Sequence, residues 1–234
     1  MSKLHVVLSA LAAALVTVST AAAVTGSNPD GTAHPYVGAL VVDGSVTCSG
    51  VLVASTVFAT AGHCTASLSP DARVQVTFDT EIDKSSWAVH DGASHTHPGY
   101  KSSGADDLGV VVLDEAAPVT PAALPSAGSV ESVTGSVTSV GYGFHGRAED
   151  GSFLYDGVRR AAESPVLHVK KTTLGISTKL AGPCLGDSGG PQLRGDTVLS
   201  LTSAGAKDCS GKAEGYRLDT AAARAFLGAF LTLP

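Results

Sequence analysis

Gly-Asp-Ser-Gly-Gly-Pro at residues 186–191 places a serine between glycines, and far upstream Thr-Ala-Gly-His-Cys at residues 60–64 places a histidine beside a cysteine. A serine on a tight turn can aim its own N–H and a neighbouring N–H at one oxyanion. A histidine fixed nearby is the base that such a serine needs. Together the two stretches indicate a serine hydrolase.

The order of these residues along the chain narrows the kind of hydrolase. A serine triad needs a nucleophile, an imidazole and a carboxylate that holds the imidazole's tautomer. The α/β-hydrolase pattern Gly-x-Ser-x-Gly is also present, but it requires a histidine after the serine, and no histidine follows His168. The subtilisin order requires an aspartate before the histidine, and the aspartates that precede His63, Asp30 and Asp43, lie in no catalytic context. The order His, Asp, Ser remains, which is the order of chymotrypsin.

Both stretches resemble signature blocks of the chymotrypsin/trypsin family, and residues 107–113 supply the third, an aspartate that opens a buried strand. Asp106 competes with Asp107 for this role, but the register of the family pattern Asp-Ile-Ala-Leu favours Asp107. The resemblance spans about residues 23 to 231. It is closest to the short secreted trypsin-like proteases of soil bacteria.

Short strand-like runs separated by Gly, Ser, Asp and Pro predict an all-β chain. The runs form two groups, at 36–42, 46–53, 57–60, 73–78 and 108–113, and then at 136–141, 166–169, 197–202 and 215–218. A helical stretch follows at 221–231, with Asp219 and Thr220 as its cap.

Three prolines between residues 118 and 125 cannot belong to a central strand and indicate a connector between the two groups. The family resemblance implies two six-stranded antiparallel β-barrels, with the site in the cleft between them and a C-terminal helix. We therefore expect a first barrel at 24–114 with His63 and Asp107, a connector at 115–128, and a second barrel at 129–234 with Ser188 and the helix.

Residues 1–23 have the features of a secretory signal peptide: a positive Lys3, an apolar run at 6–18 and small residues before a cleavage site. The apolar run is too short to span a bilayer comfortably. A buried N-terminal helix is the alternative, but this composition at the start of a chain is typical of a signal. We expect a secreted, extracellular protein.

The composition restricts the partners. The formal net charge is −6, and no basic cluster is present, so nucleic acid and anionic membranes are poor candidates. Only 15% of the residues are charged, which argues against disorder. We expect a monomer without a cofactor, with a polypeptide substrate and protein inhibitors as partners, and no membrane association once the signal is removed.

Four cysteines in an exported chain suggest two disulfides, with three connectivities open. The resemblance implies the pairs Cys48–Cys64 and Cys184–Cys209. A zinc site is the competing use of cysteine with histidine, but paired C-x-x-C spacing is absent and export favours oxidation.

Two other groups have residues that metals bind. Asp79, Glu81 and Asp83 form an acidic cluster whose spacing is not a defined calcium motif, so we interpret it as a solvated loop. His95 and His97 have metal-compatible spacing, but His97-Pro98 resembles a surface element of the family. We expect no metal site.

The resemblance implies a role for each site residue. Ser188 is the nucleophile, His63 is the general base and later the general acid, and Asp107 orients the imidazole. The N–H groups of Gly186 and Ser188 donate to the oxyanion. Taken singly, Ser188 fits a glycine-rich hairpin turn and His63 a buried structural histidine, but the three motifs in this order favour catalysis.

Asp187 precedes the nucleophile, where the family has an aspartate that pairs with a freed N-terminal ammonium. Ala23-Val24 resembles the family's Ile-Val start, and the leader ends there. We therefore hypothesise that signal cleavage itself exposes the activating terminus, without a zymogen stage. The alternative is that Asp187 only binds loop N–H groups.

Side-chain specificity is the weakest part of the resemblance. Gly182 stands where an aspartate selects Arg or Lys, so a simple trypsin assignment is not supported. Ser203 and Gly205 correspond to pocket walls, and Ala204 replaces the usual tryptophan between them. Glu214 corresponds to another pocket position: pointing inward it would bind a basic side chain, and pointing outward it is a solvated charge, which is the commoner fate of such a residue.

These features predict a secreted serine endopeptidase that acts through an acyl-enzyme. One alternative is a non-catalytic protease homologue that serves as a binding module, although such homologues usually lose a triad residue and this chain retains all three. A second alternative keeps the chemistry but has an ester as the substrate.

Overall fold

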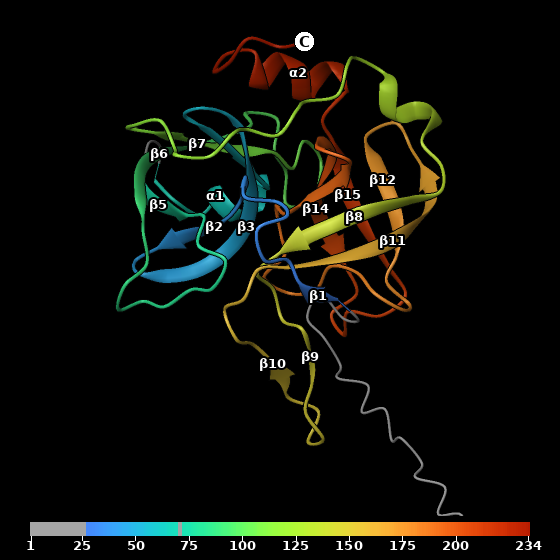
Figure 1. Cartoon of the computed structure of the whole chain (residues 1–234). Coiled ribbons are helices and arrows are strands. Elements are labelled where there is room, and N and C mark those ends of the chain that lie inside the picture. Colours follow the sequence, from blue (N-terminus) through green and yellow to red (C-terminus); the bar gives the residue numbers. More distant parts are fainter. Residues whose placement is uncertain (1–26, 70–71) are drawn as a thin grey trace, which may run out of the picture.

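The computed structural model describes residues 27–69 and 72–234, so the expected signal peptide lies outside the described residues. Two closed six-stranded antiparallel β-barrels stand side by side (Figure 1). The all-β prediction of two such barrels with a C-terminal helix is confirmed. No helix in the described part of the chain is long and apolar enough to cross a membrane.

The first barrel closes in the order β2-β3-β4-β7-β6-β5. Its strands are β2 (Val37–Val42), β3 (Ser45–Ala54), β4 (Val57–Thr60), β5 (Arg73–Thr77), β6 (His90–Thr96) and β7 (Gly109–Leu113). Alternate apolar residues such as Leu40, Leu52 and Phe58 fill its interior and are fully buried. Period-2 alternation directs these side chains to one face of each strand, and closure of the sheet makes that face a core.

The second barrel closes because β11 pairs with both β12 and β8. Its strands are β8 (Ser136–Gly141), β11 (Arg160–Val169), β12 (Thr173–Ser177), β13 (Pro191–Arg194), β14 (Thr197–Gly205) and β15 (Lys212–Arg217). A short hairpin of β9 (Gly146–Arg147) and β10 (Phe153–Leu154) protrudes from it (Figure 1).

Three short helices complete the described chain: α1 (Gly62–Thr65), the 3-10 helix η1 (Ser129–Ser132) and α2 (Ala221–Leu227). Thr220 caps α2 by accepting a hydrogen bond from the N–H of Ala223, which is the predicted cap. The helix ends at Leu227, earlier than the expected 231.

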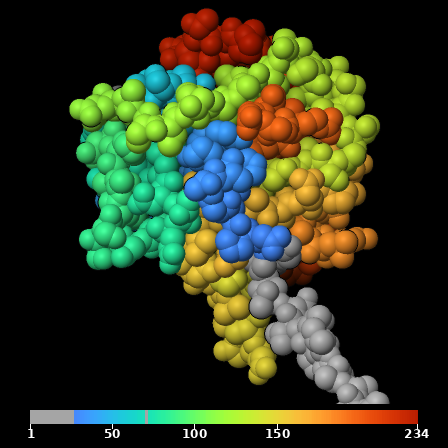
Figure 2. Space-filling model, in the orientation of Figure 1, coloured from blue at the N-terminus to red at the C-terminus, as the bar shows by residue number. Residues whose placement is uncertain are grey.

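The N-terminal segment lies across both barrels (Figure 2). Its strand β1 (Asn28–Pro29) pairs with β11 of the second barrel. Beside it the fully buried Arg159 donates 2.9 Å to Oδ2 of Asp30 and also to the carbonyls of Val37 and Phe78 in the first barrel. This ion pair therefore joins the segment to both barrels.

Candidate active site

His63 and Asp107 form a close pair on the first barrel. His63 lies in α1, directly after β4, and Asp107 lies two residues before β7. The backbone N–H of His63 donates a 2.8 Å hydrogen bond to Oδ1 of Asp107, and Nδ1 of the His63 ring lies 2.9 Å from Oδ2 of Asp107. An ionised carboxylate only accepts, so the proton sits on Nδ1 and Nε2 is left free to act as a base.

The neighbouring aspartate points elsewhere. Asp106 has a φ of +48° and accepts a 2.9 Å hydrogen bond from the Tyr216 hydroxyl. Of the two candidates that the sequence offered, it is Asp107 that contacts His63.

Asp107 is 2% exposed and is kept ionised by its donors. Burial alone would raise the pKa of this carboxyl, but hydrogen bonds from His63 and Ser203 and the charge of a protonated His63 hold it below its usual range. Ser203, expected only as a pocket wall, donates 2.5 Å to Oδ2. A buried anion beside an imidazole is what stabilises the imidazolium during proton transfer.

Ser188 comes from the second barrel and lines the same surface pocket as His63, together with Thr47 and Cys48. Among the described residues, no hydrogen bond joins Oγ of Ser188 to the His63 ring. Such contacts are often long in an unliganded site and shorten when substrate binds. The arrangement brings a hydroxyl, an imidazole and a carboxylate into one place.

Residues 184–190, which we call the oxyanion loop, present two backbone N–H groups. The N–H groups of Asp187, Gly189 and Gly190 donate to the carbonyls of Cys184, Thr202 and Asp187. Within the described chain, the N–H groups of Gly186 and Ser188 have no acceptor. These are the two donors that an oxyanion would need.

Asp187 is buried under this loop. Its carboxylate accepts 2.8 Å hydrogen bonds from the N–H groups of Gly143 and Cys184. Burial raises the pKa of Asp187 to about 7 in spite of these bonds. No cationic side chain of the described residues forms an ion pair with it, so the carboxylate lacks the positive partner that would stabilise its charge.

Two disulfides fix the segments that carry the site. Cys64, the residue after His63, is bonded to Cys48. Cys184, the first residue of the oxyanion loop, is bonded to Cys209. These are the pairs that the resemblance implies. The Cys48 and Cys64 sulfurs lie near His63 but are joined to each other, and so they cannot act as thiolate ligands.

The residues expected in the specificity pocket differ in their surroundings. A Cβ at Gly182 would lie 2.7 Å from Cγ2 of Thr178, so no side chain fits there without a shift. Gly205 is the exposed last residue of β14, one after Ala204. The hydroxyl of Ser203 donates its hydrogen bond to Asp107.

Glu214 lies on β15, where its carboxylate is 3.0 Å from Nε2 of His168, 3.4 Å from Nζ of Lys170 and 3.9 Å from Nζ of Lys212. Burial would raise the pKa of Glu214, but the charges of His168 and Lys170 and the hydrogen bond from Lys170 hold it below its usual range. Glu214 is therefore not the solvated loop charge that the outward alternative described: it is a partly buried residue of a barrel strand, and its carboxylate is paired with three basic side chains.

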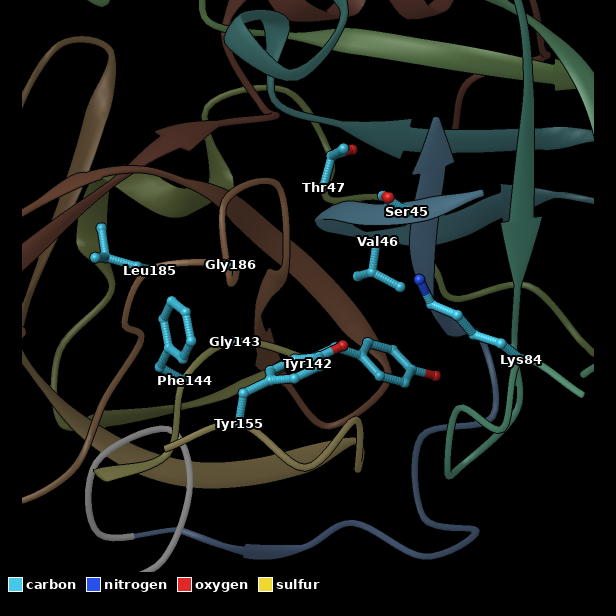
Figure 3. Close-up of a pocket in the computed structure, with 10 residues that line it drawn as sticks. All are labelled: Ser45, Val46, Thr47, Lys84, Tyr142, Gly143, Phe144, Tyr155, Leu185 and Gly186. Carbon is cyan, nitrogen blue, oxygen red and sulfur yellow. The ribbon is translucent and has the colours of Figure 1, made fainter. Parts of the chain in front are cut away.

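A further pocket opens beside Gly186 (Figure 3). Phe144, Tyr155 and Leu185 give it apolar surface, and Lys84 lies at its edge. No sequence signal marked it, because its residues come from five separate segments of the chain.

Two comparisons with known proteins point to one family. The family model described as Trypsin matches residues 23–225. Human granzyme M is 30% identical over an alignment of 196 residues, and the match covers 73% of this chain and 74% of granzyme M. The solved structure of human heparin binding protein has a TM-score of 0.72 at 17% identity, over 89% of this chain and 97% of that one. This last likeness supports the fold alone. The expected closeness to bacterial proteases stays a prediction, because both of these proteins are human.

Proposed function

The chain belongs to the trypsin family, and on that premise we propose that it is a secreted serine endopeptidase that cuts polypeptides through an acyl-enzyme. The observation that carries the proposal is the Asp107–His63 pair in the pocket that Ser188 lines. Fold and family alone would not distinguish an enzyme from a binding module, because function depends on the site.

Each step of peptide cleavage has a residue to perform it. Nε2 of His63 takes the proton of Ser188 Oγ as that oxygen attacks the peptide carbonyl. The N–H groups of Gly186 and Ser188 donate to the resulting oxyanion, and Asp107 stabilises the imidazolium. His63 then gives its proton to the leaving amine, and a water molecule, deprotonated by the same imidazole, releases the acyl group from Ser188.

The partner of Asp187 is proposed to be a new N-terminal ammonium at Ala23 or Val24, which lie outside the described residues. A buried carboxylate without a cation supports this, and so does a family match that begins at residue 23. N-terminal sequencing of secreted protein should find a start between residues 22 and 26. A start well outside that window would reject removal of 1–23 as the activating cleavage.

The proposed environment and partners follow from this function. Disulfide bonds suit an oxidising compartment outside the cell. We propose a monomer whose first barrel (24–114), connector (115–128) and second barrel (129–234) bind polypeptide substrates and protein inhibitors. The apolar pocket beside Gly186 is one place for a substrate side chain (Figure 3).

The test is digestion of a diverse peptide mixture by the secreted chain, read by mass spectrometry, with Ser188→Ala as the control. Cuts that disappear in the control would support the peptidase and define its side-chain preference. Turnover of activated esters without any peptide cut would favour an esterase. A folded chain with a freed terminus that cuts neither would favour the binding module.

A further inference from the structure

Ser49, on β3 of the first barrel, contacts the oxyanion loop through both its side chain and its backbone. It is fully buried. Its Oγ donates 3.0 Å to the carbonyl of Gly186 and accepts 2.9 Å from the N–H of Tyr142. Its own N–H donates 2.9 Å to the carbonyl of Ser188. One residue of the first barrel therefore holds the carbonyls on both sides of Asp187.

The contacts of Ser49 do not involve the two oxyanion donors, the N–H groups of Gly186 and Ser188. Leu185 is held from the other side, because its carbonyl accepts 2.8 Å from the N–H of Phe144. Gly186 has a φ of +93°, and a Cβ there would lie 2.9 Å from the Cα of Gly143. The Phe144 bond fixes the peptide plane that carries the Gly186 N–H, and the Asp187 carbonyl, in the plane that carries the Ser188 N–H, accepts from the N–H of Gly190. Ser49 fixes the plane between them, and neither N–H has an acceptor among the described residues.

Ser49 is itself held in place. Its carbonyl accepts a 2.8 Å hydrogen bond from Oγ1 of the buried Thr60 on β4, three residues before His63. The strand that holds Ser49 in place thus leads into the helix that carries His63.

We propose that Ser49 is a positioning residue for the oxyanion hole: its hydroxyl fixes the Gly186–Asp187 peptide, which lies between the two peptide planes that carry the Gly186 and Ser188 N–H groups, so that both donors are aimed before substrate arrives. The inference rests on the proposed peptidase function and adds a residue to it. Donors stabilise a transition state most when they need no reorganisation. The Ser49 hydroxyl holds this loop while the buried Asp187 in it has no cationic partner among the described residues.

The test compares Ser49→Ala with the parent chain. The variant leaves the Gly186 carbonyl and the Tyr142 N–H without their partner, so the loop can rotate. A misplaced catalytic group can cost about 100-fold, so we expect kcat to fall by about 10- to 100-fold with KM within about threefold. A peptide aldehyde, whose hemiacetal oxygen occupies the oxyanion hole after Ser188 adds to it, should bind more weakly by the same factor.

Ser200→Ala is the matched control. Ser200 is also fully buried, and its Oγ donates a 2.7 Å hydrogen bond to Oε1 of Gln192 on the neighbouring strand and none to residues 184–190 of the described chain. Rates are expressed per active site, counted from the burst of p-nitrophenol released by p-nitrophenyl acetate, so that a misfolded fraction does not count as lost activity. If Ser49→Ala is not recovered folded, Ser49→Gly removes the same hydroxyl and carries the same expectation.

The outcomes separate this inference from the proposed function. A parent chain that gives neither a burst nor peptide cuts overturns both. An active parent with Ser49→Ala within twofold in kcat and aldehyde affinity, or with Ser200→Ala impaired as strongly as Ser49→Ala, overturns the role of Ser49 only. A loss of kcat and aldehyde affinity confined to the Ser49 variant supports it.

Discussion

Oγ of Ser203, on β14 of the second barrel, donates a 2.5 Å hydrogen bond to Oδ2 of Asp107, which belongs to the first barrel. The same oxygen lies 2.9 Å from Nδ1 of His63. The carboxylate of Asp107 is therefore shared between the two barrels, and its donors are complete only when the barrels are packed together.

Removing this hydrogen bond should weaken catalysis. Hydrogen bonds to charged groups contribute about 1.5–3 kcal/mol, so Ser203→Ala should lower kcat/KM by about tenfold or more, because Asp107 then holds the His63 ring less firmly. Ser210→Ala is the control, since Ser210 donates 2.9 Å to Asp208 in an exposed loop. Equal kcat/KM in both variants would contradict the prediction.

The two neighbouring aspartates should differ sharply. Asp107→Asn keeps the shape of the side chain but favours the wrong imidazole tautomer, and losses of about 10⁴-fold in kcat follow such a change in serine triads. Asp106→Asn alters only the contact with the Tyr216 hydroxyl and should keep kcat within a few-fold. Steady-state kinetics of both variants test this, and a larger loss of kcat in Asp106→Asn than in Asp107→Asn would assign the triad carboxylate to Asp106.

Much of the fold could be predicted because it depends on local pattern. The runs of β2, β4 and β7 are short and almost continuously apolar, and each became a strand. Strands β6, β12 and β13 were not predicted. The buried face of β6 carries only small residues such as Gly92 and Ser94, which give no apolar alternation.

The supporting contacts of the site could not be predicted, because they depend on tertiary structure. Ser49 and Gly186 are 137 positions apart, and Ser203 and Asp107 are 96 apart. Nothing in the sequence near Ser49 distinguishes it from other strand serines. Motif order predicted which residues to expect at the centre, whereas the residues that hold them depend on how two barrels pack.

Asp187 should make stability depend on pH in the chain that keeps its leader. Its pKa of about 7 lies above the ordinary 3.8 of an unfolded aspartate. Between about pH 4 and 7 the folded state keeps a proton that the unfolded state has lost, so stability falls as pH rises, by up to about 1.4 kcal/mol per pH unit. Urea unfolding at several pH values should show this slope, and Asp187→Asn should remove it.

The processed chain is the comparison for that slope. A terminal ammonium bound to Asp187 would favour the charged carboxylate and lower its pKa, so the fall in stability between pH 4 and 7 should be much smaller. Identical slopes in the processed and unprocessed chains would argue against insertion of the terminus.

The buried Asp30–Arg159 pair should be important for stability. Arg159 has no exposed side-chain surface, and its Nε lies 2.9 Å from Oδ2 of Asp30. Asp30→Asn leaves a buried guanidinium without its counter-charge and should cost about 3–5 kcal/mol. Asp114→Asn, which breaks the exposed pair with Arg73, should cost about 0–1 kcal/mol. Urea denaturation measures both, and similar losses would contradict the prediction.

Side-chain selectivity should not depend on Glu214. Because its carboxylate is already engaged by His168, Lys170 and Lys212, Glu214→Gln should leave the profile of cleaved peptides unchanged. An aspartate introduced at residue 182 meets a different obstacle, since its Cβ would lie 2.7 Å from Cγ2 of Thr178. Gly182→Asp should therefore give a poorly folded chain, and Thr178→Ala should rescue it only in part, because the Cα and Cβ of residue 178 remain 3.1 Å from the added Cβ. A loss of Arg or Lys cleavage on Glu214→Gln would instead mean that Glu214 turns inward when substrate binds.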